Sequence, residues 1–105
     1  DRLRWEALAC QDAGCFSLVL ECVPESLAAE ITRSLDIVTI GIGAGQDTDG
    51  QVLVLHDLLG LTPGPRPRFV RTFVDGRSLV LNALDEFTDD VRQGGFPAPA
   101  ERYAG

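Results

Sequence analysis

The stretch Phe16-Ser-Leu-Val-Leu-Glu-Cys-Val-Pro24 decides the fold. Its first five residues are almost all apolar and Pro24 closes the run, which is typical of a strand buried on both faces of a parallel sheet. Glu21 stands at the carboxyl end of that strand. In α/β proteins this end is where ligands bind and catalytic side chains project. Glu21 is therefore either a site residue or an acid that marks the strand's exit into water.

Helical patterns flank this strand on both sides. Apolar residues at helical spacing predict a helix over residues 2–13, with Gly14 as its C′ residue. Pro24 suits the first position of a second helix, which reaches residue 35. The residues that set the spacing are Trp5, Leu8 and Ala9 in the first helix and Leu27, Ile31 and Leu35 in the second.

Two further apolar runs, residues 37–40 and 52–55, predict a second and a third strand. Helix, strand, helix and strand in this rhythm imply an α/β fold with a parallel sheet. Only residues 46–51 join the last two strands, whereas a parallel crossover usually takes about a dozen residues or more. Taken alone, Asp49-Gly50 would suggest a hairpin.

The remaining residues predict a loop, a helix and a tail. Thr62-Pro-Gly-Pro-Arg-Pro67 is too rich in proline for regular structure. An amphipathic helix over residues 79–92 follows and ends at Gly94-Gly95, and residues 96–101 are expected to be extended. The apolar stripe of this helix consists of Val80, Leu84, Phe87 and Val91.

Composition bounds the class of protein. The chain has 105 residues, 45% of them apolar and 24% charged, as in a soluble globular protein. Its net charge of -7 argues against nucleic acid or an anionic membrane as partner. No run approaches the roughly 18 apolar residues of a membrane span, and no signal-peptide pattern opens the chain, so we expect a cytoplasmic protein. Because it begins at Asp1 and contains no Met, we expect it to be part of a longer polypeptide.

Three cysteines, Cys10, Cys15 and Cys22, show no paired spacing. An odd number of cysteines in a chain without a targeting sequence fits reduced cytosolic thiols. A zinc site is not expected, because the one His and the three Cys do not fall into ligand-like pairs. Cys22 follows Glu21 directly, which would suit a nucleophile, but we expect a small packed side chain instead.

Three motifs carry a resemblance to a known family. Leu18-Val-Leu-Glu-Cys-Val-Pro24, Val38-Thr-Ile-Gly-Ile-Gly-Ala-Gly45 and Thr48-Asp-Gly-Gln-Val-Leu-Val-Leu-His-Asp57 occur in this order, followed by Gly60-Leu61. Together they resemble the C-terminal part of the ketopantoate hydroxymethyltransferase (3-methyl-2-oxobutanoate hydroxymethyltransferase) family. The resemblance is strongest over residues 14–62 and continues more loosely through residues 67–70 and 90–97.

The resemblance implies a (β/α)8 TIM barrel, of which this chain would be about the last three strands and helices. Residues 1–105 would form a partial barrel domain, with the site on units 1–62 and a C-terminal loop, helix and tail over 63–105. It also implies that the second and third strands are parallel. The N-terminal half of the barrel, in the same or a separate chain, would cover the apolar strand faces. The complete enzyme would be a homo-oligomer, a decamer by family, with helix 79–92 available for subunit contacts.

The implied reaction belongs to pantothenate biosynthesis and so to the coenzyme A pathway. A hydroxymethyl group passes from 5,10-methylenetetrahydrofolate to 3-methyl-2-oxobutanoate (α-ketoisovalerate), giving 2-dehydropantoate (ketopantoate). The family uses Mg²⁺ as a Lewis acid. Its metal ligands belong to the first half of the barrel, so the resemblance implies no metal ligand in this chain.

The resemblance also implies residue roles. Glu21 matches the strand-end glutamate that acts as general base, and Ile42 and Val54 match positions lining the apolar substrate pocket. Ordinary barrel packing is the alternative for these two. Gly41-Ile-Gly-Ala-Gly45 lacks the spacing of a dinucleotide fingerprint, so we read Gly41, Gly43 and Gly45 as sites of close backbone approach to a ligand.

Two further groups remain open. His56 and Asp57 end the predicted third strand, where a structural hydrogen-bonding role is favoured over acid–base work. Arg66, Arg68 and Arg71 form a local basic patch, which either attracts the folate's glutamate tail or is a solvated loop with surface ion pairs.

Two other functions compete with this reading. One is a related barrel enzyme of the phosphoenolpyruvate mutase or isocitrate lyase type that acts through a metal-bound enolate. The other is a non-catalytic piece that serves only assembly. We expect the fragment alone to be inactive in every case.

Overall fold

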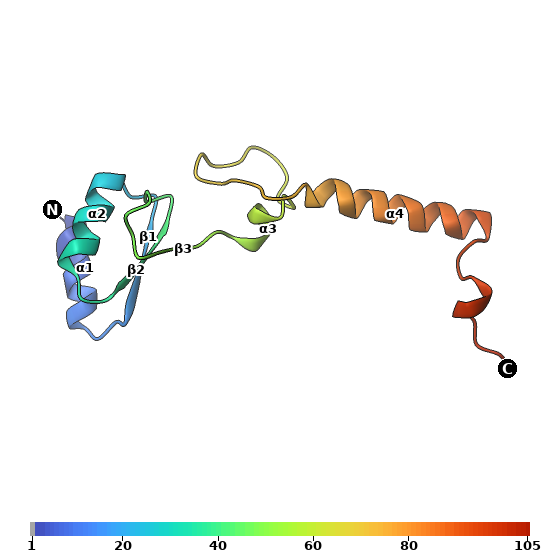
Figure 1. Cartoon of the computed structure of the whole chain (residues 1–105), viewed down its shortest axis with the longest axis horizontal. Coiled ribbons are helices and arrows are strands. Elements are labelled where there is room, and N and C mark those ends of the chain that lie inside the picture. The colour runs from blue at the N-terminus through green and yellow to red at the C-terminus, as the bar shows by residue number, and fades with distance from the viewer. Residues whose placement is uncertain (1) are drawn as a thin grey trace.

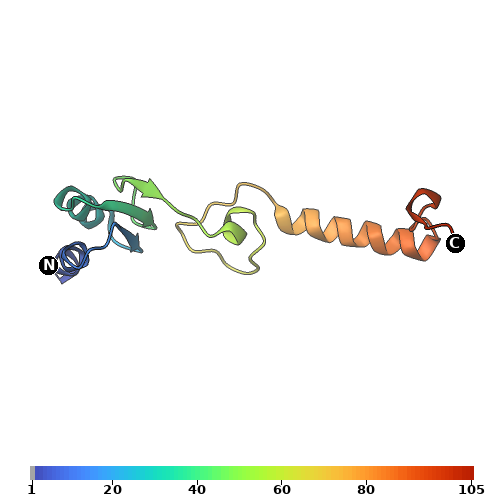
Figure 2. The same cartoon turned by 90° about the horizontal axis from the view of Figure 1, so that it is seen from below.

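The computed structural model describes residues 2–105, and the chain they form is elongated (Figures 1 and 2). It measures 68 × 33 × 17 Å with a radius of gyration of 22.7 Å, whereas a compact domain of this length would have about 13 Å. A small α/β unit forms one end and a long helix the other, with a loop region between them.

The α/β unit contains a three-stranded sheet in the order β1-β2-β3, with both pairs parallel. The predicted parallel α/β sheet is therefore confirmed, and a hairpin at Asp49-Gly50 does not form. The elements in chain order are α1 (Arg2–Asp12), β1 (Ser17–Glu21), α2 (Glu25–Ser34), β2 (Val38–Ile42) and β3 (Gly50–Gln51).

The third strand differs from the prediction. It occupies Gly50–Gln51 and not residues 52–55, and its ladder ends where the Val52 N–H donates to the Gly41 carbonyl at 3.0 Å. The short parallel connection is held by Asp49, whose Oδ2 accepts the Thr39 N–H at 2.8 Å. The Asp49 side chain thus holds a connection that contains no crossover helix. As a result, the chain pairs with β2 from Gly50 on, two residues before the predicted start of the third strand. The apolar run after it turns away from the sheet.

Both predicted N-terminal helices form, with different burial from that expected. The Cys15 N–H donates to the Cys10 carbonyl and the Gly14 N–H to the Gln11 carbonyl, which is a Schellman ending with Gly14 at φ +97°. The residue of α1 that is buried is Ala7, whereas Trp5, one of the residues that set the helical spacing, is 70% exposed. Pro24 precedes α2 as its N-cap residue and is not its first helical residue.

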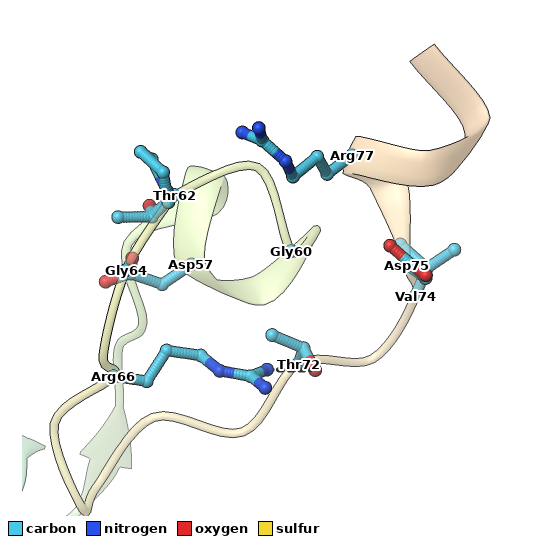
Figure 3. Close-up of a pocket in the computed structure, with 10 residues that line it drawn as sticks. Asp57, Gly60, Thr62, Gly64, Arg66, Thr72, Val74, Asp75 and Arg77 are labelled. Carbon is cyan, nitrogen blue, oxygen red and sulfur yellow. Dashed lines mark hydrogen bonds between the residues drawn. The ribbon is translucent and has the colours of Figure 1, made fainter. Parts of the chain in front are cut away.

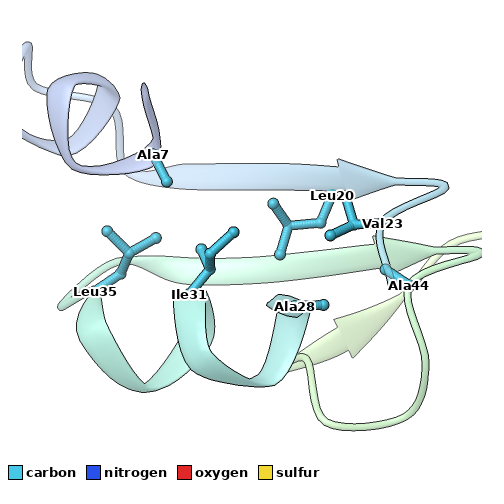
Figure 4. Packing of buried hydrophobic residues seen from close by; sticks show 7 residues of the cluster. All are labelled: Ala7, Leu20, Val23, Ala28, Ile31, Leu35 and Ala44. Atoms are coloured by element: carbon cyan, nitrogen blue, oxygen red, sulfur yellow. The ribbon is translucent and has the colours of Figure 1, made fainter. Parts of the chain in front are cut away.

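The core lies between the sheet and helices α1 and α2 (Figure 4). Leu20 of β1 meets Ile31 of α2 there, and Ile31 is fully buried. Thr39 is buried on the same side, where its hydroxyl hydrogen-bonds Thr32 of α2 at 2.8 Å. The buried cluster consists of Ala7, Leu20, Val23, Ala28, Ile31, Leu35 and Ala44.

Within the described residues, no helix covers the opposite face of the sheet (Figure 4). Strand side chains alternate between faces, so the register that pairs Val19 with Ile40 and Glu21 with Ile42 places these four side chains on the face away from the core. Val19 is 55% exposed and Val38 49%. A sheet of this kind is normally covered on both faces.

The C-terminal part contains α3 (Leu55–Leu58), α4 (Gly76–Gln93) and the 3₁₀-helix η1 (Pro99–Glu101). Helix α4 begins three residues before the predicted start because Asp75 caps it: its carboxylate accepts hydrogen bonds from the Ser78 N–H and hydroxyl, which lower the pKa of Asp75. Gly94, at φ +75°, ends it as predicted. The tail is not fully extended, since η1 interrupts it.

The apolar stripe of α4 remains uncovered within the described residues. Phe87 is 52% exposed although its ring meets that of Phe96 edge-on at 5.3 Å. Leu84 and Val91 are exposed to a similar degree. Over residues 2–105 no helix is both long and apolar enough to cross a membrane.

Candidate active site at the carboxyl edge of the sheet

Glu21 is the last residue of β1 and lies at the carboxyl edge of the sheet, on the face without helices. Its neighbour in the register is Ile42, the last residue of β2. The Cys22 N–H donates to the Ile42 carbonyl at 2.9 Å and closes the ladder directly after Glu21. The backbone therefore fixes the carboxylate beside an apolar side chain at the strand ends.

Cys22 has a feature that the sequence did not reveal: its φ of +52° is the one left-handed value of a non-glycine residue among residues 2–105. This region is unfavourable for residues with a Cβ and is often found beside functional sites. The turn redirects the chain from β1 into Pro24 and α2. Cys22 is exposed, so the expectation of a small packed side chain is wrong. The residue serves the turn that ends the Glu21 strand.

The Glu21 carboxylate is exposed, and no hydrogen bond or ion pair holds it within the described residues. Water reaches the exposed oxygens, so this geometry fits a site residue and equally an acid at the strand's exit into water. The carboxylate oxygens are thus free to accept a proton from a bound molecule.

The three glycines at the end of β2 approach side chains of their own chain. A Cβ on Gly41 would lie 2.6 Å from Thr48 Oγ1, and one on Gly43 would lie 2.9 Å from Phe69 Cδ1. A Cβ on Gly45 would lie 2.4 Å from a side-chain carbon of Glu25. Gly43 and Gly45 also have positive φ values of +65° and +77°. Packing within the chain already requires these glycines, and no ligand contact is needed to explain them.

The two predicted pocket residues are in different surroundings. Ile42 lines a hollow of about 480 Å³ together with Val52, Phe69 and Phe73. Val54 is not part of its lining and is 53% exposed, beyond the end of the β3 ladder. The described residues therefore bring Ile42, but not Val54, next to Glu21.

His56 and Asp57 do not end a strand, so the predicted location of this pair was wrong. Both lie in α3, since the chain leaves the sheet after Val52. Asp57 lines a separate hollow of about 550 Å³ within the loop region, together with Thr62, Arg66 and Asp75 (Figure 3).

The three arginines do not form one patch. Arg66 turns into the loop hollow, where it donates to Thr72 Oγ1 at 2.6 Å (Figure 3). Arg68 lines a hollow of about 570 Å³ beside Cys22 at the sheet edge. Arg71 borders the hollow of Ile42, with its guanidinium 5.8 Å from the centre of the Phe73 ring. Two of the three arginines therefore adjoin the Glu21 edge.

The described residues do not provide a set of ligands for a metal ion at this edge. Among residues 2–105 no three His, Cys, Asp or Glu side chains come together so that they could hold a metal. Hard cations such as Mg²⁺ require several oxygen ligands at once. No chemical step at this edge is therefore assigned to a metal held by this chain.

We predict that the isolated chain binds no Mg²⁺ stoichiometrically, because Glu21 has no second carboxylate beside it in the register. Isothermal titration of MgCl₂ into residues 1–105 measures this. A saturable site with one equivalent of Mg²⁺ would contradict the prediction.

The described residues thus define the class of the protein as α/β with a parallel sheet, and Glu21 lies at the edge where α/β proteins of this class bind ligands. Residues 1–99 match the family model described as ketopantoate hydroxymethyltransferase. This chain belongs to that family, as the sequence resemblance indicated.

Similar proteins with curated names agree with the family. The 3-methyl-2-oxobutanoate hydroxymethyltransferase of Methylobacterium sp. (strain 4-46) is 58% identical over 103 residues, which are 98% of this chain and 36% of the relative. The 3-methyl-2-oxobutanoate hydroxymethyltransferase 2 of Bradyrhizobium diazoefficiens is 55% identical over 102 residues, which are 97% of this chain and 35% of the relative. The Bdellovibrio bacteriovorus enzyme is 54% identical over 98 residues, 93% of this chain and 37% of its own. The chain thus spans about a third of the length of the curated relatives that it matches.

Proposed function

We propose that this chain is the part of a ketopantoate hydroxymethyltransferase that carries the general base. The complete enzyme would transfer a hydroxymethyl group from 5,10-methylenetetrahydrofolate to 3-methyl-2-oxobutanoate. The observation that carries the proposal is the position of Glu21, unpaired at the carboxyl edge of a parallel sheet in a chain of this family. The family match favours this reaction over the phosphoenolpyruvate mutase or isocitrate lyase type.

We further propose that residues 1–105 are a partial (β/α)8 barrel. Residues 1–62 would carry the site, and residues 63–105 would be the C-terminal loop, helix and tail. The support is the apolar sheet face without helices, on which Val19 and Val38 stay exposed. Barrel interiors are filled by layers of such side chains from all the strands. The remaining strands would come from the other two thirds of the enzyme, which would assemble as a homo-oligomer in the cytoplasm. Any Mg²⁺ would be held by residues outside this chain.

In this proposal Glu21 removes the proton from C3 of the oxo acid. The C–H bond breaks, the proton moves to the carboxylate, and the electron pair remains as an enolate whose carbon bonds to the one-carbon unit. The two C–N bonds that join this unit to tetrahydrofolate break, and water supplies the hydroxyl group. The proton taken by Glu21 and the second proton of the water go to the two folate nitrogens, and tetrahydrofolate leaves. Ile42, next to Glu21 in the register, would contact the isopropyl carbons. A carboxylate performs this task near neutral pH when a closed site partly desolvates it. The closed site would be completed by the missing strands.

A chimera tests the function. It consists of the Methylobacterium enzyme in which the 103 matching residues are replaced by this chain. We expect it to fold and to form 2-dehydropantoate from the oxo acid and methylenetetrahydrofolate, with the unmodified Methylobacterium enzyme as control. A folded chimera without turnover would refute the proposal and would leave the chain a non-catalytic assembly piece.

A further inference from the structure

The segment that follows α3 differs in charge from the rest of the chain. In a chain of net charge -7, residues 58–74 contain three arginines and no acidic residue. Two of these arginines, Arg68 and Arg71, lie beside the edge where Glu21 is exposed. A cationic surface in an acidic protein attracts anions and requires a reason.

Phe69 anchors the segment to the sheet edge. Its ring lies so close to Gly43 that a Cβ there would be 2.9 Å from Cδ1, and the side chain is half-buried. The Val70 N–H donates to the Pro67 carbonyl at 3.0 Å, which closes a turn with Arg68 and Phe69 at its tip. The anchored ring and the turn hold the arginines on either side of Phe69 near the strand ends.

The two arginines at this edge form no ion pair within residues 2–105, and Glu25 lines the hollow of Arg68 without pairing with it. Within residues 2–105 no carboxylate lies within 4 Å of Arg68 or Arg71 in an ion pair. Arg66, in contrast, turns away from the edge, donates to Thr72 and faces Asp75, whose pKa it helps to lower. Arg68 and Arg71 each line a hollow at the strand ends, of about 570 and 480 Å³.

We propose that Arg68 and Arg71 bind the glutamate carboxylates of the folate co-substrate. The inference rests on the proposed function and assigns its second substrate to one side of the site. A guanidinium binds a carboxylate through two parallel N–H donors, so it suits this end of the molecule. Both arginines are exposed at the rim of open hollows, which suits the flexible tail of a large co-substrate. The small oxo acid is assigned to Glu21 and Ile42, which are neighbours in the strand register.

Replacing both arginines by glutamine in the chimera tests this. We expect the KM for methylenetetrahydrofolate with three glutamates to rise about three- to tenfold, since exposed ion pairs are individually weak. The KM for the oxo acid and kcat at saturation should stay unchanged. The matched control is R33Q/R92Q, which removes the same two charges from the last turns of α2 and α4.

Ionic strength gives a second readout. In the unchanged chimera the folate KM should rise with salt, and in R68Q/R71Q this dependence should be smaller. A rise in the oxo acid KM alone would assign the arginines to that substrate and overturn the inference. An unchanged folate KM in the double variant would also overturn it.

The anchor provides a test that leaves the charges in place. Gly43→Ala should push the Phe69 ring away and raise the folate KM in the same direction as R68Q/R71Q. Gly64→Ala is the control, because Gly64 also has a positive φ, +85°, and no described atom lies within 4 Å of a Cβ there. A further assay measures exchange of the oxo acid's C3 proton with solvent deuterium in the absence of folate. This assay separates failure of the proposed function from failure of the arginine inference. Loss of exchange in the unchanged chimera refutes the proposed function, whereas normal exchange with an unchanged folate KM refutes only the arginine inference.

Discussion

Glu21→Gln in the chimera is expected to lower kcat by a factor of about 10² to 10⁴ with little change in KM, because the amide keeps the size of the side chain but cannot accept the proton. Since no donor among residues 2–105 holds the carboxylate, the substitution removes no hydrogen bond that the fold needs. The loss should therefore appear in catalysis and not in stability.

Deuterium exchange at C3 of the oxo acid, measured without folate, isolates the proton transfer. Glu30→Gln is the control: it removes one acid from the outer side of α2, where Glu30 forms an exposed ion pair with Arg4, and such pairs contribute little. Exchange at the unchanged rate in the Glu21 variant would rule out Glu21 as the base.

The second large effect concerns folding of residues 1–105 alone. We expect no cooperative thermal transition, because one sheet face and the apolar stripe of α4 are both uncovered. The buried cluster of the described residues has seven members, three of which are alanines, and Ile31 is its largest fully buried side chain. Short chains that bury so little apolar surface are marginally stable at best.

Circular dichroism during heating, with binding of an apolar fluorescent dye, measures this. The chain should melt gradually and bind dye at low temperature, as loosely packed states do, whereas the chimera should melt in one sharp step. A sharp transition of the monomeric chain without dye binding would show that it is an independent domain.

The sequence predicted those elements whose signals are local. Glycines at 14 and 94 ended their helices as expected, since a left-handed residue after a helix is a backbone requirement of that position. The apolar run before Glu21 gave the first strand within one residue. The family resemblance, not the periodicity, indicated that β2 and β3 are parallel.

Contacts between distant residues account for the errors. The third strand was displaced because Asp49 bonds to Thr39 and brings Gly50 into the ladder, which no hydrophobic pattern reveals. His56 and Asp57 were misplaced for the same reason. Packing of Phe69 on Gly43 and the left-handed Cys22 also depend on the folded chain. The role of Glu21 stays a prediction until the chimera is assayed.

The register of β1 against β2 has one further consequence. Leu20 faces the helices and Glu21 the open face only because Glu21 pairs with Ile42. A slip by one residue would exchange these two side chains, placing a charge in the core and a leucine at the strand edge. Because burying that charge would cost free energy, the carboxylate disfavours the slipped register of β1 against β2. In the proposed enzyme, a barrel that has closed in the wrong alignment would thus be both unstable and without its base.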